Sequence, residues 1–178
     1  IILKIDNDGS CSWLRRVGGG VVVRSASYSG GIKAVHAVDG GVILYIVSYT
    51  HTHQKPSEEI EGAIPTEILG EVFENTDLFA KISEDGVWID AEACPRAGTI
   101  YPGPYYYKCG DYSISQDTII VHWNDAPPWC SNSQSSGRII TLDGYATSPV
   151  NMCVAGEHTR SVSIGQNGEA YVIYQGEM

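Results

Sequence analysis

The chain has 178 residues, and its 11 basic against 21 acidic side chains give a formal net charge of −10. Nucleic acids and anionic membranes are bound through clusters of Lys and Arg, so this balance argues against both as partners. No apolar run approaches the roughly 18 residues that span a membrane as a helix, and membrane insertion is not expected.

Turn dipeptides, either Asp-Gly or Asn-Gly, divide the chain at short intervals and accept the positive φ angles of tight hairpin turns. They occur at residues 8–9, 39–40, 85–86, 143–144 and 167–168. Between them lie β-branched and aromatic runs of strand length. The predicted strands are residues 1–6, 21–29, 32–38, 42–50, 78–83, 87–91, 118–123, 138–142, 161–164 and 170–174.

The first predicted strand is apolar although it lies at the start of the sequence. Its apolar residues are Ile1, Ile2, Leu3 and Ile5. Because such a strand is not expected to stay exposed to water, it should pair within the fold or with a neighbouring subunit. The length predicts a single β domain over residues 1–178, with residues 1–10 as a possible intersubunit strand. Residues 6–10 lack the downstream Glu of an EF-hand calcium loop and are predicted to form a plain turn.

The middle of the chain holds its most apolar strand and one segment with helical spacing. Residues 42–47 are apolar on both faces, which is typical of a central, buried strand in a meander over residues 21–49. Residues 65–73 predict a helix of one to two turns, although Gly70 weakens it. The residues that would share a face of this helix are Ile68, Leu69, Val72 and Phe73.

The spacing of strands and turns predicts an all-β fold with at most one short helix. The expected architecture is an antiparallel β-sandwich or a jelly-roll-like barrel with disulfide-pinned loops. Residues 161–164 and 170–174, on either side of Asn167-Gly168, are the clearest predicted hairpin.

The five cysteines show no C-x-x-C spacing, which argues against a structural zinc site and a thioredoxin-like redox site. Four of them border two long irregular regions, residues 94–112 and 126–137. The expected disulfides are Cys94–Cys109 and Cys130–Cys153, although the sequence allows other pairings. Cys11 is then left over, and an odd cysteine indicates a free thiol or an intermolecular bond.

One histidine pair has the spacing of metal ligands. Residues i and i+2 of a strand share a face, so His51 and His53 could bind one metal, with Glu58 as a third ligand. The spacing H-x-H-x4-E resembles the first metal-binding motif of the cupin family. That resemblance implies a jelly-roll-like barrel and a metal-dependent enzyme. The alternative is an exposed strand end that binds nothing.

Two loops are rich in large aromatic side chains. The residues are Tyr105, Tyr106, Tyr107, Trp123 and Trp129. Exposed Tyr and Trp stack on sugars or form protein interfaces at low entropic cost. The alternative is that these rings cover one end of the hydrophobic core.

The composition favours an extracellular, secreted or surface-attached protein, because only 18% of the residues are charged and lysines are few. No nucleophile elbow, P-loop or dinucleotide fingerprint occurs, so neither an enzyme nor a cofactor is expected. The sequence predicts a structural subunit, of a filament, appendage, sheath or virion, that forms a homopolymer by β-strand pairing. The alternatives are a carbohydrate-binding or adhesin module for surface glycans and a cupin-like enzyme.

Overall fold

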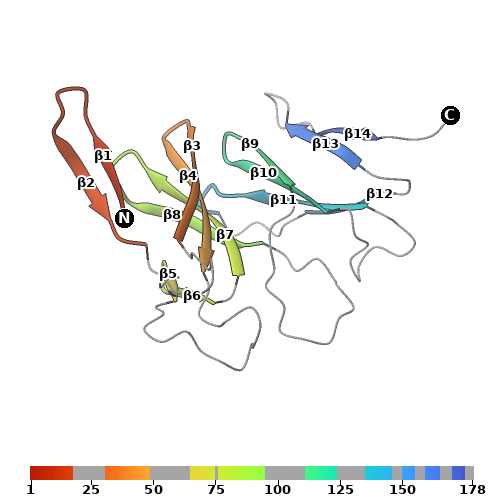
Figure 1. The fold of residues 1–178 in the computed structure, drawn as a ribbon, viewed down its shortest axis with the longest axis horizontal. Helices are drawn as coiled ribbons and strands as arrows, with labels where there is room; N and C mark the ends of the chain where they lie inside the picture. The colour runs from red at the N-terminus through yellow and green to blue at the C-terminus, as the bar shows by residue number, and fades with distance from the viewer. Residues whose placement is uncertain are drawn as a thin grey trace, which may run out of the picture. The chain divides into compact units, whose positions relative to one another are not determined.

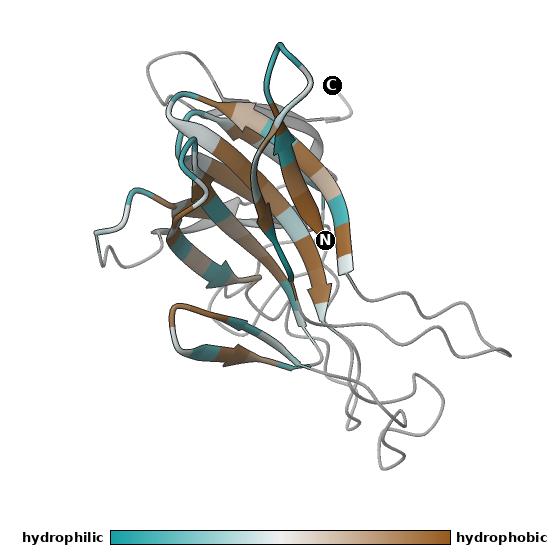
Figure 2. Cartoon of the chain, turned by 90° about the vertical axis from the view of Figure 1, so that its left-hand side faces the viewer, coloured by the Kyte–Doolittle hydropathy of each residue, from teal (hydrophilic) through white to brown (hydrophobic). Residues whose placement is uncertain are grey.

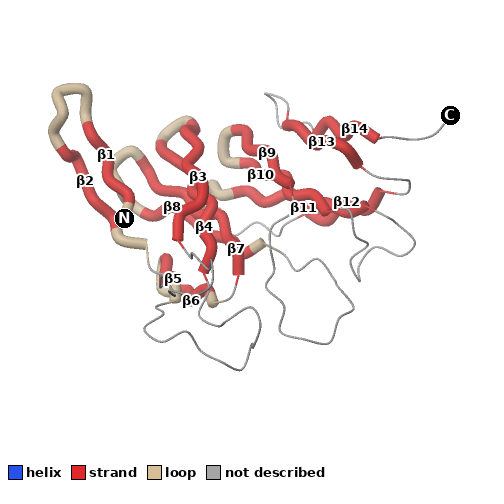
Figure 3. Tube along the Cα trace, viewed as in Figure 1, coloured by secondary structure: helices blue, strands red, loops and turns tan. Residues whose placement is uncertain are grey.

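The computed structural model describes residues 1–17, 31–48, 65–74, 76–94, 111–123, 135–145, 150–154, 159–164 and 170–174. The chain divides into two compact units, and the described residues of the first unit all lie within residues 1–93. Every regular element in the described ranges is a β-strand and none is a helix (Figure 3). All strand pairs are antiparallel, which confirms the predicted all-β class. No helix that could cross a membrane occurs in this part of the chain.

The first unit contains one four-stranded sheet and two separate hairpins (Figure 1). The sheet has the order β3-β4-β7-β8, and β4 lies at its centre as predicted. Its strands are β3 (Gly31–Val38), β4 (Gly41–Ser48), β7 (Thr76–Ser83) and β8 (Trp88–Ala93). The hairpins are β1 (Ile2–Ile5) with β2 (Cys11–Arg15), and β5 (Thr66–Ile68) with β6 (Glu71–Phe73).

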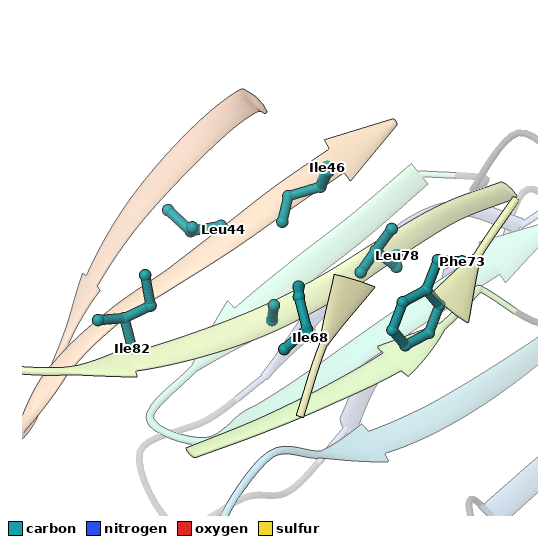
Figure 4. Packing of buried hydrophobic residues seen from close by; sticks show 7 residues of the cluster. Leu44, Ile46, Ile68, Phe73, Leu78 and Ile82 are labelled. Atoms are coloured by element: carbon teal, nitrogen blue, oxygen red, sulfur yellow. The ribbon is translucent and has the colours of Figure 1, made fainter. Parts of the chain in front are cut away.

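The core of the first unit lies on one face of β4 and β7. Hydrophobic residues run along the strands, whereas several hairpin turns are hydrophilic (Figure 2). The buried cluster takes alternate residues from the two central strands and two residues from the β5–β6 hairpin (Figure 4). Its members are Leu44, Ile46, Ile68, Phe73, Leu78, Ala80 and Ile82. The alternation follows from the period of two in a strand, which points successive side chains to opposite faces.

The opposite face of β4 and β7 is also buried. Ile43 and Phe79 are fully buried there, and the Phe79 ring stacks on Tyr45 with centroids 5.3 Å apart. The Tyr45 hydroxyl donates a hydrogen bond to the carboxylate of Asp77, which is itself fully buried. Burial on both faces is why residues 42–47 read as a continuous apolar run.

The helix predicted at residues 65–73 is wrong, because this segment forms the β5–β6 hairpin. Leu69 and Gly70 have φ angles of 55° and 82°, which form a tight turn and cannot continue a right-handed helix. Ile68 and Phe73 are buried, whereas Leu69 in the turn is exposed. The apolar residues of this short run match a helical spacing by coincidence, because short apolar runs do not distinguish a helix from strands.

The second unit contains a four-stranded sheet of order β12-β11-β10-β9 and the β13–β14 hairpin. The predicted strand 118–123 and the predicted C-terminal hairpin are confirmed. The elements are β9 (Asp111–Ser115), β10 (Thr118–Trp123), β11 (Ser135–Thr141), β12 (Val150–Val154), β13 (Thr159–Ile164) and β14 (Ala170–Tyr174). The central strand β10 carries fully buried Ile119, Ile120 and Val121.

The described strands form open sheets. The four-stranded sheets end at β3 and β8 and at β9 and β12, and no pairing among the described strands joins these edges. No closed barrel is therefore formed in this part of the chain, and the barrel form of the expected fold is wrong there. A closed barrel requires its first and last strands to share a hydrogen-bond ladder. The sandwich form stays a prediction.

Candidate functional site

The candidate site is the N-terminal hairpin formed by β1 and β2. Residues 6–10 form its turn, in which Asp6 N donates to Ser10 O at 2.9 Å and Gly9 N donates to Asp6 O at 2.9 Å. Gly9 has a φ of 84°, so this five-residue turn requires a residue that tolerates the left-handed region. These residues therefore form a turn, as predicted.

The turn end of the hairpin is acidic. The Asp8 carboxylate accepts hydrogen bonds from the Ser10 hydroxyl at 2.7 Å and from Ser10 N at 2.9 Å. These two bonds favour the ionised form and lower the pKa of Asp8. The Ser12 hydroxyl donates to the Asp6 carboxylate. Asp8 is exposed and stays ionised, so the turn presents negative charge to the solvent.

The register of the hairpin gives it two different faces. Leu3 lies opposite Leu14, and Lys4 lies opposite Trp13. Residues opposite one another in an antiparallel pair lie on the same face, and successive residues alternate between faces. We call the partly buried face the inner face; its members are Ile2, Lys4, Trp13 and Arg15.

The inner face docks on the turn between β7 and β8. Lys4 Nζ and Trp13 Nε1 both donate to the carbonyl oxygen of Glu84, at 3.1 Å and 2.7 Å. Arg15 Nε donates to the carbonyl oxygen of Gly86 at 2.5 Å. The indole lies so close to Gly86 that an added Cβ would meet Trp13 Cγ at 2.6 Å. Only glycine therefore fits below the Trp13 ring.

The outer face of the hairpin is apolar and exposed. We define it by the side chains of Leu3, Ile5, Cys11 and Leu14. Leu3 is 48% exposed, Ile5 53% and Leu14 52%, and the adjoining Ile1 is 76% exposed. Cys11 lies opposite Ile5 and is an exposed free thiol. One surface thus combines large hydrophobic side chains with the only free cysteine among the described side chains.

The hairpin is a two-stranded sheet of its own. β1 pairs with β2 along one edge, and no ladder joins either strand to the four-stranded sheet within the described residues. Of the two alternatives for the apolar terminal strand, pairing within the chain holds for one edge of β1. Pairing of Ile1, Ile2, Leu3 and Ile5 with a neighbouring subunit stays a prediction, and it concerns the other edge.

Few of the other predicted site residues lie in the described part of the chain. Cys94 is buried and disulfide-bonded, and its partner is not among the described side chains. Cys109 and Cys130 lie outside them as well. Cys153 is part of β12, opposite Ser136 in β11, and only its backbone is described. The pairings Cys94–Cys109 and Cys130–Cys153 therefore stay predictions.

The predicted metal ligands and most of the predicted aromatic contacts also lie outside the described residues. This holds for His51, His53, Tyr105, Tyr106, Tyr107 and Trp129. Trp123 ends β10, opposite Ser136, and only its backbone is described. Among the described side chains, no group of three His, Cys, Asp or Glu residues could hold a metal ion.

Sequence reasoning missed β2 and the docking role of Lys4, Trp13 and Arg15. The sequence does contain a pattern that relates this hairpin to its docking site. The pattern Lys-Ile-x-x-Asp-Gly begins at Lys4 and again at Lys81. The first copy forms the N-terminal hairpin, and the second forms the turn on which that hairpin docks. No family model matches the chain, nor does any curated protein or solved structure. With no similar protein to compare, we infer the function from the geometry of the N-terminal hairpin.

Proposed function

We propose that the protein is a structural subunit of an extracellular assembly and that it associates with copies of itself through the N-terminal hairpin. One observation carries this proposal: the inner face of the hairpin is anchored to its own chain, while the outer face presents exposed hydrophobic side chains. Contiguous exposed apolar residues mark interaction surfaces in soluble proteins. A hairpin whose strands have open edges can in addition extend a sheet across two chains.

The size of the outer face indicates what kind of contact it can make. Complete burial of an Ile or Leu side chain contributes about 1.5–3 kcal/mol, so burying the remaining half of each contributes about 1 kcal/mol. Ile1, Leu3, Ile5 and Leu14 together would then contribute about 4 kcal/mol, which corresponds to roughly millimolar affinity. Side-chain burial alone is too weak for a stable dimer. Main-chain pairing along a hairpin edge, or many repeated contacts, must supply the rest.

Cys11 provides a second means of holding two copies together. Its thiol is exposed on the outer face, where a neighbouring chain would lie. In an oxidising compartment two such thiols, one from each copy, form a disulfide and pass two electrons and two protons to dioxygen or to a disulfide donor. The bond would make a weak contact permanent.

The test compares self-association of the full chain with that of matched surface variants. Sedimentation velocity over a concentration series and negative-stain images should show association by the wild type and its loss in Leu3→Ser/Leu14→Ser. The control, Val35→Ser/Val72→Ser, changes side chains that are 54% and 55% exposed and lie away from the hairpin. Serine keeps the charge constant in both double variants.

Two results would contradict the proposal. One is a wild type that remains monomeric at its highest soluble concentration, and the other is equal association by the two double variants. A monomer that binds to a glycan array would instead favour the carbohydrate-binding alternative.

A further inference from the structure

Two hairpins of the first unit have the same register. In β1–β2, Lys4 lies opposite Trp13 and Ile5 lies opposite Cys11, with an irregularity between the two pairs. In β7–β8, Lys81 lies opposite Asp90 and Ile82 lies opposite Trp88, again with an irregularity between the pairs. In both hairpins the paired residues are separated by the same numbers of positions along the chain. The shared sequence Lys-Ile-x-x-Asp-Gly therefore produces one hairpin geometry twice.

The two turns also share their hydrogen bonds. In residues 83–87, Ser83 N donates to Val87 O at 2.8 Å and Gly86 N donates to Ser83 O at 2.9 Å. The equivalent bonds of residues 6–10 are both 2.9 Å long. Gly86 has a φ of 77° and Gly9 a φ of 84°. Each turn thus has a glycine with positive φ at the same position and the same pair of backbone hydrogen bonds.

Among the described residues, another element docks on only one of these two turns. Residues 83–87 accept the inner face of the N-terminal hairpin, with the Trp13 indole over Gly86. An ideal Cβ on Gly9 would have nothing within 4 Å, and residues 6–10 are all exposed. The tip of the N-terminal hairpin is therefore a vacant copy of a turn that this chain already uses as a docking site.

We propose that the turn at residues 6–10 binds the inner face of the N-terminal hairpin of a second copy. The occupied turn contains Glu84 and Asp85, and it receives an indole flanked by Lys4 and Arg15. The vacant turn contains Asp6 and Asp8, so its charge is complementary to the same cationic, aromatic face. This inference rests on the proposed self-association and adds to it a second contact, distinct from the outer face, that forms where the inner face is released from its own turn.

The contact would give the assembly a direction. The inner face and the vacant turn are different surfaces of one hairpin, so joining them between copies is a heterologous contact. Contacts of this type build open chains unless their rotation closes a ring. Each added subunit would leave a new vacant turn at the growing end.

The occupied turn competes for the same inner face. Docking within one chain proceeds at an effective concentration on the order of millimolar, so the chain's own turn is occupied at micromolar protein concentration. A second copy is bound only where the local concentration is comparably high, as in a dense surface layer, or where the chain's own turn is blocked. Association is thus expected to depend steeply on concentration.

Gly86→Ala is the variant that blocks the chain's own turn. The added methyl would lie 2.6 Å from Trp13 Cγ, at a φ of 77° that disfavours alanine, so the indole must leave Gly86. The released inner face is expected to bind the vacant turn of another copy. Sedimentation velocity should then show association at a concentration at least about tenfold below that of the wild type, because the intramolecular competitor is gone.

Gly9→Ala, added to Gly86→Ala, is expected to reduce association to the wild-type level or below it, because the methyl occupies the position of the incoming indole. If Gly86→Ala does not fold by circular dichroism, Asp8→Lys in the wild-type background tests the same contact at high concentration. Asp39→Lys is its control, since it makes the same charge change at another exposed turn. Asp8→Lys should weaken association at least about tenfold more than Asp39→Lys, because it reverses the charge of the turn.

The outcomes separate this contact from the broader proposal. The inference is overturned if the wild type assembles while the Gly9 and Asp8 substitutions leave its association unchanged; self-association through the outer face then stands. Equal association by Gly86→Ala and Gly86→Ala/Gly9→Ala also overturns it, because exposed hydrophobic surface alone would explain the gain. If wild type and Gly86→Ala are both monomeric at every concentration, both proposals fail.

Discussion

Replacing Trp13 by alanine is expected to release the N-terminal hairpin while the rest of the first unit stays folded. Truncating a buried aromatic side chain costs about 3–5 kcal/mol, and the partly buried Trp13 should cost about 2 kcal/mol in packing. Loss of the 2.7 Å hydrogen bond to the Glu84 carbonyl adds about 0.5–1 kcal/mol. The expected total is about 2.5–3 kcal/mol of docking free energy.

Leu14→Ala is the matched control, because Leu14 is the next residue of β2 and points to the opposite face. Leu14 is already 52% exposed, so its truncation should cost about 1 kcal/mol or less. The two variants therefore change neighbouring large side chains of one strand. They differ in whether the side chain contacts the turn below the hairpin.

Native-state hydrogen exchange of the cross-strand amides of β1 and β2 measures this docking energy directly. An undocked two-stranded hairpin is marginally stable in water, so these amides lose protection when docking weakens. We expect a fall of about 60- to 140-fold for Trp13→Ala and about fivefold or less for Leu14→Ala. Amides of β4 should keep their protection in both variants. Equal protection of β1 and β2 in the two variants would show that the indole does not hold the hairpin on the turn.

Three further results are expected. Gly41→Ala should lower the free energy of unfolding in urea by about 3 kcal/mol or more, because its Cβ would lie 2.0 Å from a carbonyl oxygen of β7. Its control, Gly40→Ala, has a φ of 76° and open space around the Cβ, and should lower it by about 1–2 kcal/mol. Equal losses in the two variants would contradict the close packing of Gly41 against β7. Iodoacetamide followed by peptide mapping should label Cys11 in the native protein and Cys94 only after reduction and unfolding; early labelling of Cys94 would contradict its burial in a disulfide. Because the folded-state pKa of Asp8 is lowered, its stabilising hydrogen bonds persist above its ordinary pKa and are lost as the pH falls through the lowered value; an NMR titration giving an ordinary pKa for Asp8 would show that those bonds are not formed.

Strand positions were predictable where one residue type dominates a run. Residues 42–47 are apolar at every position, and this pattern correctly indicated the central strand β4 with both faces buried. The hairpin around Asn167-Gly168 was predictable because that dipeptide favours the positive φ angles of a tight turn. The β5–β6 hairpin was not, because three-residue strands are too short to show a period of two.

The candidate site was predictable only in part. The apolar character of Leu3 and Ile5 indicated a strand that needs a partner, and the odd cysteine count pointed to Cys11. β2 was not predicted because it begins directly after the polar turn and mixes polar and apolar residues without a clear pattern. The pairing of β1 with β2 could therefore not be read from β1 alone.

The all-β class, the positions of most described strands and the odd number of cysteines can all be read from the linear sequence. These properties depend on local periodicity, turn propensity and counting, which a linear chain displays directly. Which face of the N-terminal hairpin is buried follows instead from its docking on the turn between β7 and β8. That choice depends on Trp13 and Gly86, which are far apart in the sequence and meet because a side-chain-free glycine leaves room for an indole. Such complementarity between distant residues has no local sequence pattern.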